Sequence, residues 1–389
     1  MTDDDAIEVS IVAPSLNESL TIGDFVDWCK EGLAAAGVRG EIVIVDSSTD
    51  DTAEIALAHG ARVLKTPRRG LGRAYIDAVP TLRGKYVIMG DCDCTYDFRH
   101  LGPFVERFRA GDEFIMGSRF RGSIERGAMP PLHRYFGTPI TTWILNVIYG
   151  SRFSDIHCGM RGITLSALQR MKLRSQSWEY ASEMVLKSVH MGLQTAEVPI
   201  HFLKDRRGRL SHHKRSAWYS PWTAAWINLR AMFVNGANFF LFKPGLVLLA
   251  LGLALVVPLT FGPVTLGPIT LSIYWMLLGL SLSILGLQCV HMGILAKVFF
   301  DVRGVESAKW LRIFSYNRSM LVTAVLLLSG VFLAGFLVRD YVAGGLRLAE
   351  IQAISSYRAI AGLLLIVASF TNFTFTLVLH AAHATMGRE

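Results

Sequence analysis

Two carboxylates stand two residues apart in the string GDCDCTYD, which directly follows the apolar run KYVIM. The run is typical of a strand, so Asp91 and Asp93 are expected where that strand ends. Acid groups with this spacing can bind one divalent cation, which neutralises a pyrophosphate. We predict that both residues contact a ribose or a metal, with Asp93 as the direct ligand of Mg²⁺ or Mn²⁺, because oxygen ligands favour these ions over zinc.

Two cysteines within this string, Cys92 and Cys94, alternate with the acids and should point to the opposite side. We expect them to be buried as small hydrophobic side chains rather than to bind a metal as thiolates. The chain has five cysteines, whose scattered positions form neither a disulfide framework nor a paired C-x-x-C zinc array. This usage favours a reducing compartment.

Strand-like and helix-like segments alternate through the first half of the chain. The apolar runs in EVSIVAPS, EIVIVDSS and RVLKT are separated by helical patterns. Near-continuous Val and Ile in these runs predict an α/β fold, with a parallel, Rossmann-like sheet covered by helices on both faces. Ligands of such sheets bind at the carboxyl ends of the strands, where Asp46 and Asp91 both fall.

The composition indicates a membrane protein with one globular domain. The chain has 389 residues, of which 51% are hydrophobic, and its mean hydropathy is +0.37. A net charge of +8 suits anionic lipid and phosphate better than nucleic acid, because no aromatic-basic RNA module is found. The start MTDDDAIEVS is acidic and lacks an apolar signal region, so we expect the first domain on the cytoplasmic face of the cell membrane.

The second half of the chain carries the membrane segments. Residues 221–243 mix Trp and Phe with Arg and Lys, which predicts interfacial amphipathic helices. From Gly245 to Ala296 there is no Asp, Glu, Lys or Arg, and the break GPVTLGP predicts a helical hairpin through the bilayer. We therefore expect a first domain at 1–220, interfacial helices at 221–243 and a transmembrane domain at 244–389. About four spans are expected, near 245–261, 269–296, 320–338 and 359–379.

The loop between the second and third predicted spans is basic, whereas the turn within the first hairpin is uncharged. This asymmetry predicts that the basic loop, the first domain and the C-terminus all lie in the cytoplasm. The cationic residues of this loop are Lys297, Arg303, Lys309, Arg312 and Arg318.

Several ordered motifs identify a family resemblance. The motifs are PSLNE, VDSSTDDT, GDCDCTYDF, GSRF, GAMPPLHRYFG, DIHCGMRG, EVPI and the Arg-Arg-Gly-x-x-Ser stretch from Arg206 to Ser211. Together they resemble family 2 glycosyltransferases with the GT-A fold. Within that family they are similar to the branch that makes polyprenyl-phosphate sugars, such as dolichyl-phosphate mannose and glucose synthases. The resemblance covers roughly the first 240 residues.

The resemblance implies a set of residues around the donor nucleotide: Pro14, Asn17, Glu18, Asp46, Gly70, Gly72, Asp91 and Asp93. The glycines would permit close approach of phosphate. The alternatives are a helix cap at Asn17 or Ser19 and a turn role for Asp46. Family members commonly carry a second Asp where this chain has Ser47.

Arginines are the predicted phosphate ligands, because a guanidinium group binds phosphate oxygens bidentately. The resemblance places Arg119, Arg134 and Arg206 or Arg207 around the donor and acceptor phosphates, with a hydroxyl contact from Ser211. With Asp93, these four arginines form the expected catalytic set. The alternative is surface charge near an anionic membrane, which carries most weight for Lys214 and Arg215.

Other polar residues receive more ordinary interpretations. A packing role is expected for the stretch from Asp155 to Arg161, rather than Cys-His nucleophilic chemistry. Glu179 and Glu183 share a helix face, where one of them contacts donor sugar hydroxyls or both are simply solvated. His291 is expected to be a packing group between helices.

These features predict an inverting transfer of a hexose from a nucleotide diphosphate sugar to a polyprenyl phosphate, with Mg²⁺ or Mn²⁺ as cofactor. UDP-glucose or a related UDP-hexose is slightly preferred, and GDP-mannose is next. A homo-oligomer is compatible with this interpretation. One alternative is a processive polysaccharide synthase, which the missing Q-x-x-R-W string disfavours. Another is a noncatalytic nucleotide-binding membrane scaffold, suggested by Ser47.

Overall fold

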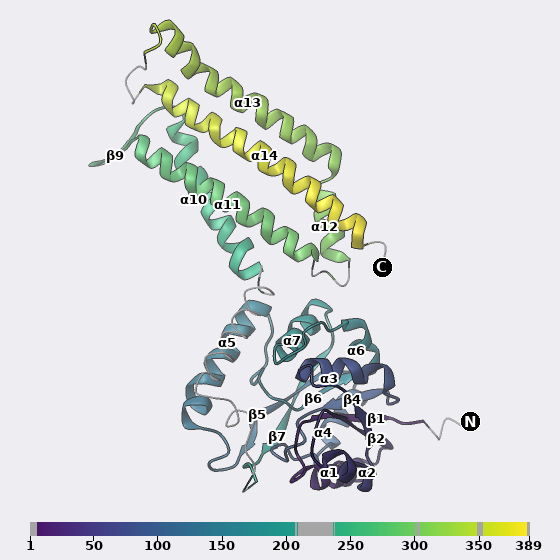
Figure 1. Cartoon of the computed structure of the whole chain (residues 1–389). Coiled ribbons are helices and arrows are strands. Elements are labelled where there is room, and N and C mark those ends of the chain that lie inside the picture. The colour runs from purple at the N-terminus through teal and green to yellow at the C-terminus, as the bar shows by residue number, and fades with distance from the viewer. Residues whose placement is uncertain are drawn as a thin grey trace. The chain divides into compact units, whose positions relative to one another are not determined.

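Apolar strands from the first half of the chain form one mixed sheet. In the computed structural model, the described residues are 6–206, 208, 236, 238–299, 301, 304–347 and 353–386. They divide into two compact units, Met1–Asn235 and Gly236–Glu389 (Figure 1). Arg207, Ser211 and most of the predicted interfacial helices lie outside the described residues.

The sheet of the first unit has the order β3-β2-β1-β4-β6-β5-β7 within the described residues. Neighbouring strands β3, β2, β1 and β4 are parallel, as the apolar runs predict. β6 is antiparallel to both β4 and β5, so the sheet is mixed rather than fully parallel. The strands are β1 Val9–Ser15, β2 Gly40–Asp46, β3 Arg62–Lys65, β4 Tyr86–Met89, β5 Phe114–Ile124, β6 Arg161–Thr164 and β7 Thr195–Phe202.

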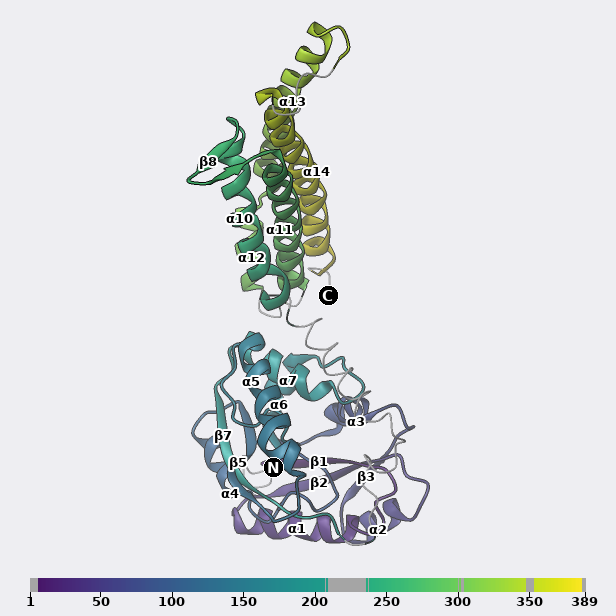
Figure 2. The same cartoon turned by 90° about the vertical axis from the view of Figure 1, so that its left-hand side faces the viewer.

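Helices cover both faces of this sheet. Figure 2 shows α1 and α2 along one face, while α3 and α7 lie on the other. The central strands carry fully buried Ile and Val side chains, such as Ile11, Ile44 and Ile88, because both faces are covered. The α-helices in the described part of this unit are α1 Ile22–Ala35, α2 Thr52–Ala58, α3 Leu71–Ala78, α4 Gly102–Arg109, α5 Thr138–Tyr149, α6 Leu165–Met171 and α7 Tyr180–His190.

The strand order reverses at β1. From β1 the chain builds outward through β2 and β3, then returns to place β4 on the other side of β1. The carboxyl ends of β1 and β4 therefore flank a topological switch point, where open α/β sheets bind ligands. The segments that follow β1, β2 and β4 meet at this edge.

Within the described residues, the second unit contains four helices that are long and apolar enough, by length and composition, to cross a membrane. They cover Asn238–Leu259, Ile273–Phe299, Tyr316–Ala343 and Ile354–Ala384. This number agrees with the four predicted spans. The helices are α10 Lys243–Leu259, α11 Ile273–Phe299, α12 Val305–Ile313, α13 Tyr316–Ala343 and α14 Ile354–Met386.

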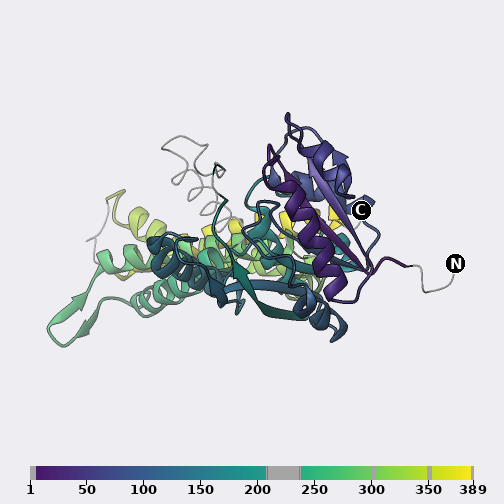
Figure 3. The same cartoon turned by 90° about the horizontal axis from the view of Figure 1, so that it is seen from below.

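Glycines allow α10 and α11 to pack closely. A Cβ atom on Gly252 would lie 2.5 Å from the backbone nitrogen of Ser283, and one on Gly286 would lie 2.3 Å from that of Leu249. The predicted break between these helices is a β-hairpin of β8 Val264–Leu266 and β9 Ile269–Leu271, visible at the end of the helical unit in Figure 3. Helix α13 packs against α14, which also contacts α11.

Candidate functional site

The carboxyl ends of β1 and β2 are held together by side chains that follow them. Ser15 pairs with Asp46 across the two strands and donates a 2.7 Å hydrogen bond to its carboxylate. The backbone N–H of Ser48 and the ammonium of Lys65 lie 3.2 Å and 3.1 Å from the same group. Burial favours the neutral acid, but these three donors hold the pKa of Asp46 below its ordinary value. Asp46 is thus a buried, ionised group.

The segment after β1 is fixed to the segment after β2. Asn17 has the positive φ of 54° and accepts a 2.9 Å hydrogen bond from the N–H of Thr49 through Oδ1. The N–H of Glu18 donates to Thr52 Oγ1 at 3.0 Å. The N-cap residue of α1 is Thr21. The alternative that Asn17 caps this helix is therefore wrong, because its side chain joins two loops at the sheet edge.

Asp91 and Asp93 follow β4 in the same region, and both are half-buried. Asp93 Oδ1 accepts hydrogen bonds from the N–H and hydroxyl of Thr95, at 2.9 and 2.6 Å. This local turn fixes the backbone and directs the carboxylate. Cys92 and Cys94 are buried, as predicted, and their thiols donate to the carbonyls of Pro14 and Thr21.

Gly159 lies against Asp91, a contact that the sequence analysis did not identify. A Cβ atom at Gly159 would lie only 2.7 Å from Asp91 Oδ2 and 3.0 Å from the Tyr96 ring. The N–H of Gly159 donates a 2.8 Å hydrogen bond to the Tyr96 hydroxyl. The missing side chain thus leaves room for the carboxylate. In the sequence, only the glycine of the motif DIHCGMRG pointed to such a close contact.

Gly70 and Gly72 lie beneath the segment that precedes α7. Added Cβ atoms would approach the carbonyl oxygens of Gln176 and Ser175, both at 2.3 Å. Close packing against this segment therefore explains why both positions are glycine. The close approach of a phosphate to them stays a prediction. The N–H of Arg73 also donates to the Gln176 carbonyl at 3.0 Å.

Glu183 supports this covering segment. Its carboxylate accepts hydrogen bonds from the N–H groups of Arg174 and Ser175, at 3.0 and 2.8 Å, and lies 2.6 Å from the Lys187 ammonium. Glu183 is buried, so the alternative that it lies on a solvent-exposed helix face is wrong. By contrast, Glu179 has a buried Oε2 atom without a hydrogen-bond partner in the described part of the chain.

Arg119 on β5 forms a buried ion pair with Asp155. Its Nε and Nη2 atoms donate to the two carboxylate oxygens at 2.7 and 2.8 Å. Burial alone would lower the pKa of Arg119, but its interactions with Tyr96 and with the Asp155 carboxylate raise it above the ordinary value. Arg119 was predicted to bind phosphate, and its pairing with Asp155 was not predicted from the sequence. Of the three guanidinium nitrogens of Arg119, only Nη1 has no hydrogen-bond partner among the described residues.

Arg134 lies on a short π-helix, His133–Gly137, that leads into α5. Its guanidinium lies 5.5 Å from the centre of the Tyr135 ring. Large apolar side chains at helical spacing are exposed along this segment and α5, which the sequence alone did not predict. They are Leu132, Tyr135, Phe136, Ile140, Trp143 and Val147, which we call the α5 apolar face.

Arg206, near the end of the described part of the first unit, is ion-paired with Asp24 on α1. Its guanidinium lies 5.8 Å from the Trp28 ring, over which Arg99 also sits at 4.4 Å. The structure thus gathers the residues after β1, β2 and β4 at one edge. Arg134 and Arg206 contact other parts of the unit. Arg134 contacts Tyr135, whereas Arg206 contacts Asp24 and Trp28 on α1.

The stretch from Asp155 to Arg161 packs rather than reacts. Arg161 is 1% exposed and donates to the backbone carbonyls of Ile156, Cys158 and Ala181. Burial raises the pKa of Cys158 to about 12 and lowers that of His157 to about 4. A buried thiol with a raised pKa is a poor nucleophile, which contradicts Cys-His chemistry. In the second unit, His291 stacks on Phe375 at 4.2 Å, as a packing group does.

No group of three or more His, Cys, Asp or Glu side chains that could hold a metal is found within the described ranges. An ion at Asp91 and Asp93 would therefore take further ligands from water or substrate. The two half-buried carboxylates fit such a hard cation, whereas the thiols of Cys92 and Cys94 are buried and donate hydrogen bonds to backbone carbonyls.

Comparison with known proteins gives consistent relatives. The model of the family "Glycosyl transferase family 2" matches residues 10–174. The chain is 34% identical over 376 residues to the low-salt glycan biosynthesis hexosyltransferase Agl6 of Haloferax volcanii, covering 94% of this chain and 89% of that protein. It is 30% identical over 208 residues to the dolichyl-phosphate hexose transferase of the same organism, covering 52% of this chain and 85% of that protein.

Solved structures are similar at lower identity. One is glucosyl-3-phosphoglycerate synthase from Mycobacterium tuberculosis, crystallised with Mn²⁺, UDP and phosphoglyceric acid. It is 21% identical, with a TM-score of 0.43, and the match covers 58% of this chain and 78% of that protein.

Proposed function

The chain belongs to glycosyltransferase family 2, and we propose that it transfers a hexose from a nucleotide diphosphate sugar to a polyprenyl phosphate, with inversion at the anomeric carbon. We prefer UDP-glucose or a related UDP-hexose as donor, with GDP-mannose next. The dolichyl-phosphate hexose transferase similarity supports a lipid phosphate as acceptor.

The observation that carries this proposal is the exposed α5 apolar face together with Arg134, whose guanidinium lies 5.5 Å from the ring of Tyr135 in that face. An exposed apolar patch on a globular unit marks a surface that meets a membrane or an apolar ligand. A cation beside one aromatic side chain of that patch suits a ligand with a phosphate at one end and hydrocarbon at the other. A polyprenyl phosphate has this chemistry, whereas a soluble sugar acceptor does not.

The donor nucleotide is assigned to the edge formed by Asp46, Asn17 and Asp91. The hydrogen bonds that join these loops fix their positions before the donor binds, which reduces the entropy lost on binding. The ionised carboxylate of Asp46 can accept hydrogen bonds from the base or ribose. Pro14, Glu18, Gly70 and Gly72 complete the proposed donor site.

Asp91 and Asp93 would hold Mg²⁺ or Mn²⁺, because their carboxylates are hard oxygen donors. When bound, such an ion supplies charge neutralisation for the diphosphate that leaves the sugar. The Thr95 hydrogen bonds to Asp93 keep that side chain in one orientation for this purpose.

In the proposed reaction, an oxygen of the lipid phosphate attacks the anomeric carbon while the bond from that carbon to the diphosphate oxygen breaks. The nucleoside diphosphate leaves with the electron pair. The acceptor needs no general base, because the second pKa of a phosphate monoester is about 6 and the group is ionised near neutrality. Arg134 holds the acceptor phosphate, together with Arg206 or Arg207 and Ser211, and Arg119 offers its Nη1 atom as a further donor, since Asp155 takes its other two nitrogens.

We also propose that the catalytic unit and the C-terminus lie on the cytoplasmic side. The support is the basic segment between the second and third spans, which contains Lys309, Arg312 and Arg318. The boundaries proposed for the catalytic domain, interfacial helices and transmembrane domain remain 1–220, 221–243 and 244–389.

The test is incubation of the purified full-length protein with a panel of nucleotide sugars and polyprenyl phosphates, followed by mass analysis of the lipids. We expect a polyprenyl-phosphate hexose from one donor, only with a divalent cation present. Polyprenol without the phosphate is the control acceptor and should give nothing. A product on polyprenol, a polymer, or no lipid product across the whole panel would contradict the proposal.

A further inference from the structure

Helix α12 is amphipathic and is fixed to the membrane helices by one face. Trp310 and Ser307 are buried on that face. The Trp310 indole donates a 2.8 Å hydrogen bond to Glu306, and its ring lies 5.6 Å from that of Phe242 at the start of α10. The N–H of Ser307 donates to the Asp301 carboxylate at 2.7 Å. These contacts give α12 a defined position.

The opposite face of α12 is exposed and lines a pocket of about 470 Å³. Its residues recur at spacings of four along the helix, so they form two adjacent rows. Val305 and Ile313 are 61% and 47% exposed, and Lys309 and Arg312 lie among these apolar side chains. The pocket is lined by Gly304, Val305, Ala308, Lys309, Arg312 and Ile313.

The charge of this pocket is positive. Within the described residues, neither Lys309 nor Arg312 forms an ion pair. The nearest acid on the helix, Glu306, accepts the Trp310 indole hydrogen bond on the packed side. Lys309 lies 5.3 Å from the Trp310 ring, which places its ammonium at the rim of the apolar surface. The pocket therefore combines two cations with exposed aliphatic groups.

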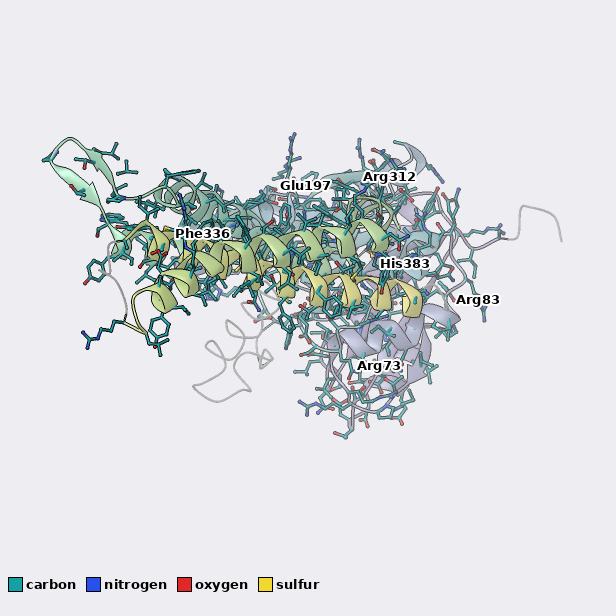
Figure 4. All side chains as sticks on the ribbon, turned by 90° about the horizontal axis from the view of Figure 1, so that it is seen from above. Arg73, Arg83, Glu197, Arg312, Phe336 and His383 are labelled. Atoms are coloured by element: carbon teal, nitrogen blue, oxygen red, sulfur yellow. The ribbon has the colours of Figure 1, made fainter. Side chains whose placement is uncertain are left out.

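The pocket is at one end of the membrane helices. Lys297, near the end of α11, lies 3.8 Å from the Phe242 ring at the start of α10. His380, near the end of α14, is hydrogen-bonded to the carbonyl of Phe314 just after α12. Figure 4 shows Arg312 and His383 toward one end of these helices and Phe336 toward the other. The helices are long and apolar enough to cross a membrane, so we place this end at a membrane surface.

We infer that the α12 pocket is a second lipid-phosphate site, which binds the terminal phosphate monoester of a polyprenyl phosphate through Lys309 and Arg312. The inference rests on the proposed function for the identity of the lipid. A phosphate monoester carries a charge of about −1.5 to −2 near neutrality, which two cations balance. A phosphodiester headgroup with one negative charge matches the pair less well. Val305 and Ile313 contact the first isoprenoid units.

This site is distinct from the proposed acceptor position at Arg134, which belongs to the other unit. Its role is to concentrate a scarce lipid at the protein before transfer. Loss of such a site raises the acceptor concentration needed for half-maximal rate, whereas the rate at saturating acceptor stays the same.

The test uses the full-length protein in nanodiscs and measures the retention of polyprenyl phosphate by native mass spectrometry without any donor. In the double variant Lys309→Gln/Arg312→Gln, binding of the second polyprenyl phosphate should be about 10-fold weaker, a difference of about 1.4 kcal/mol, whereas binding of the first lipid should not change. The charge-preserving variant Lys309→Arg/Arg312→Lys should retain binding. Arg347→Gln, which removes an exposed cation beyond the opposite end of α13, is the matched control and should bind as the unmodified protein does.

A parallel titration with phosphatidylglycerol separates the monoester from general anionic lipid. Equal losses for both lipids, or unchanged binding of polyprenyl phosphate in a variant with native thermal stability, would overturn the inference. The assay does not require turnover. If the protein transfers no sugar but polyprenyl phosphate binding still depends on Lys309 and Arg312, the proposed function fails and the α12 site stands.

Discussion

The Arg119 guanidinium and the Asp155 carboxylate form a bidentate ion pair in which both side chains are almost completely buried. Asp155 also accepts a hydrogen bond from the backbone N–H of Arg119 at 3.2 Å. The pair joins β5 to the loop that carries Gly159, and this glycine makes room for Asp91. Two motifs that are far apart in the sequence, GSRF and DIHCGMRG, are thus connected behind the proposed donor site.

Asp155→Asn should destabilise the first unit by roughly 3–5 kcal/mol, because it leaves the Arg119 charge buried without its partner. Urea unfolding in detergent, followed by tryptophan fluorescence, measures the change. Arg170→Gln is the control, since its ion pair with Glu113 is largely exposed and should contribute at most about 1 kcal/mol. Similar midpoints for the two variants would show that the buried pair does not hold this loop.

Gly159→Ala should impair donor use more than folding. The new methyl group would meet Asp91 Oδ2 at 2.7 Å and displace the carboxylate. We expect kcat/KM for the donor to fall about 10-fold or more, with a stability loss of about 1–3 kcal/mol. Gly102→Ala is the matched control, because an added Cβ there has nothing within 4 Å. If Gly159→Ala leaves donor kinetics unchanged, Asp91 does not act where we place it.

Asp93→Asn tests the metal assignment with little change in shape. The amide oxygen can still accept both hydrogen bonds from Thr95, but the negative charge is lost. Product formation at saturating Mg²⁺ or Mn²⁺ should fall on the order of 100-fold, equivalent to about 3 kcal/mol. Asp27→Asn, on the exposed side of α1, serves as the control. Native rates for Asp93→Asn with Mg²⁺ would refute the assignment.

The two glutamates near the start of α7 should respond differently. Glu183→Gln weakens the hydrogen bonds to Arg174 and Ser175 and breaks the ion pair with Lys187. It should cost about 1–3 kcal/mol and increase amide hydrogen exchange at 174–177. Glu179→Gln should leave both unchanged, since Glu179 supports no hydrogen bond in the described structure beyond its backbone. The opposite ranking would contradict the structural role of Glu183.

Stability should decrease between pH 7 and pH 5 because of His157. Burial lowers its folded-state pKa to about 4, whereas the unfolded chain binds this proton near its ordinary pKa of 6.5. Protons therefore favour unfolding as the pH falls below 6.5, by roughly 1–2 kcal/mol at pH 5. His157→Gln can keep a hydrogen bond to Thr141 and should show a smaller pH dependence. An unchanged slope in urea titrations would argue against this origin.

Local patterns predicted the architecture well. Runs of Val and Ile, interrupted by helical segments, were enough to predict the parallel part of the sheet. They were also enough to predict that Asp46 and Asp91 lie at strand ends. The length of the apolar segments alone was enough to predict the four candidate membrane helices found among the described residues. The antiparallel β6 was not predicted, because a strand of four residues has no periodicity that reveals its direction.

Partners that are distant in the sequence could not be predicted. Nothing around Arg119 indicates that Asp155, thirty-six positions later, takes two of its nitrogens. The burial of Glu183 and the exposure of the α5 apolar face depend on which surfaces the fold covers. The identity of single residues at strand ends was predictable, whereas the contacts that support them required the tertiary structure.

In the proposed reaction, the lipid phosphate itself accepts the hexose. The most direct measurement is the mass of the lipid product together with the identity of the released nucleotide, from one reaction with polyprenyl phosphate and the preferred donor. We predict a lipid heavier by one anhydrohexose unit, with an equal amount of nucleoside diphosphate. Release of nucleoside monophosphate, with a lipid that has also gained a phosphate, would contradict the account.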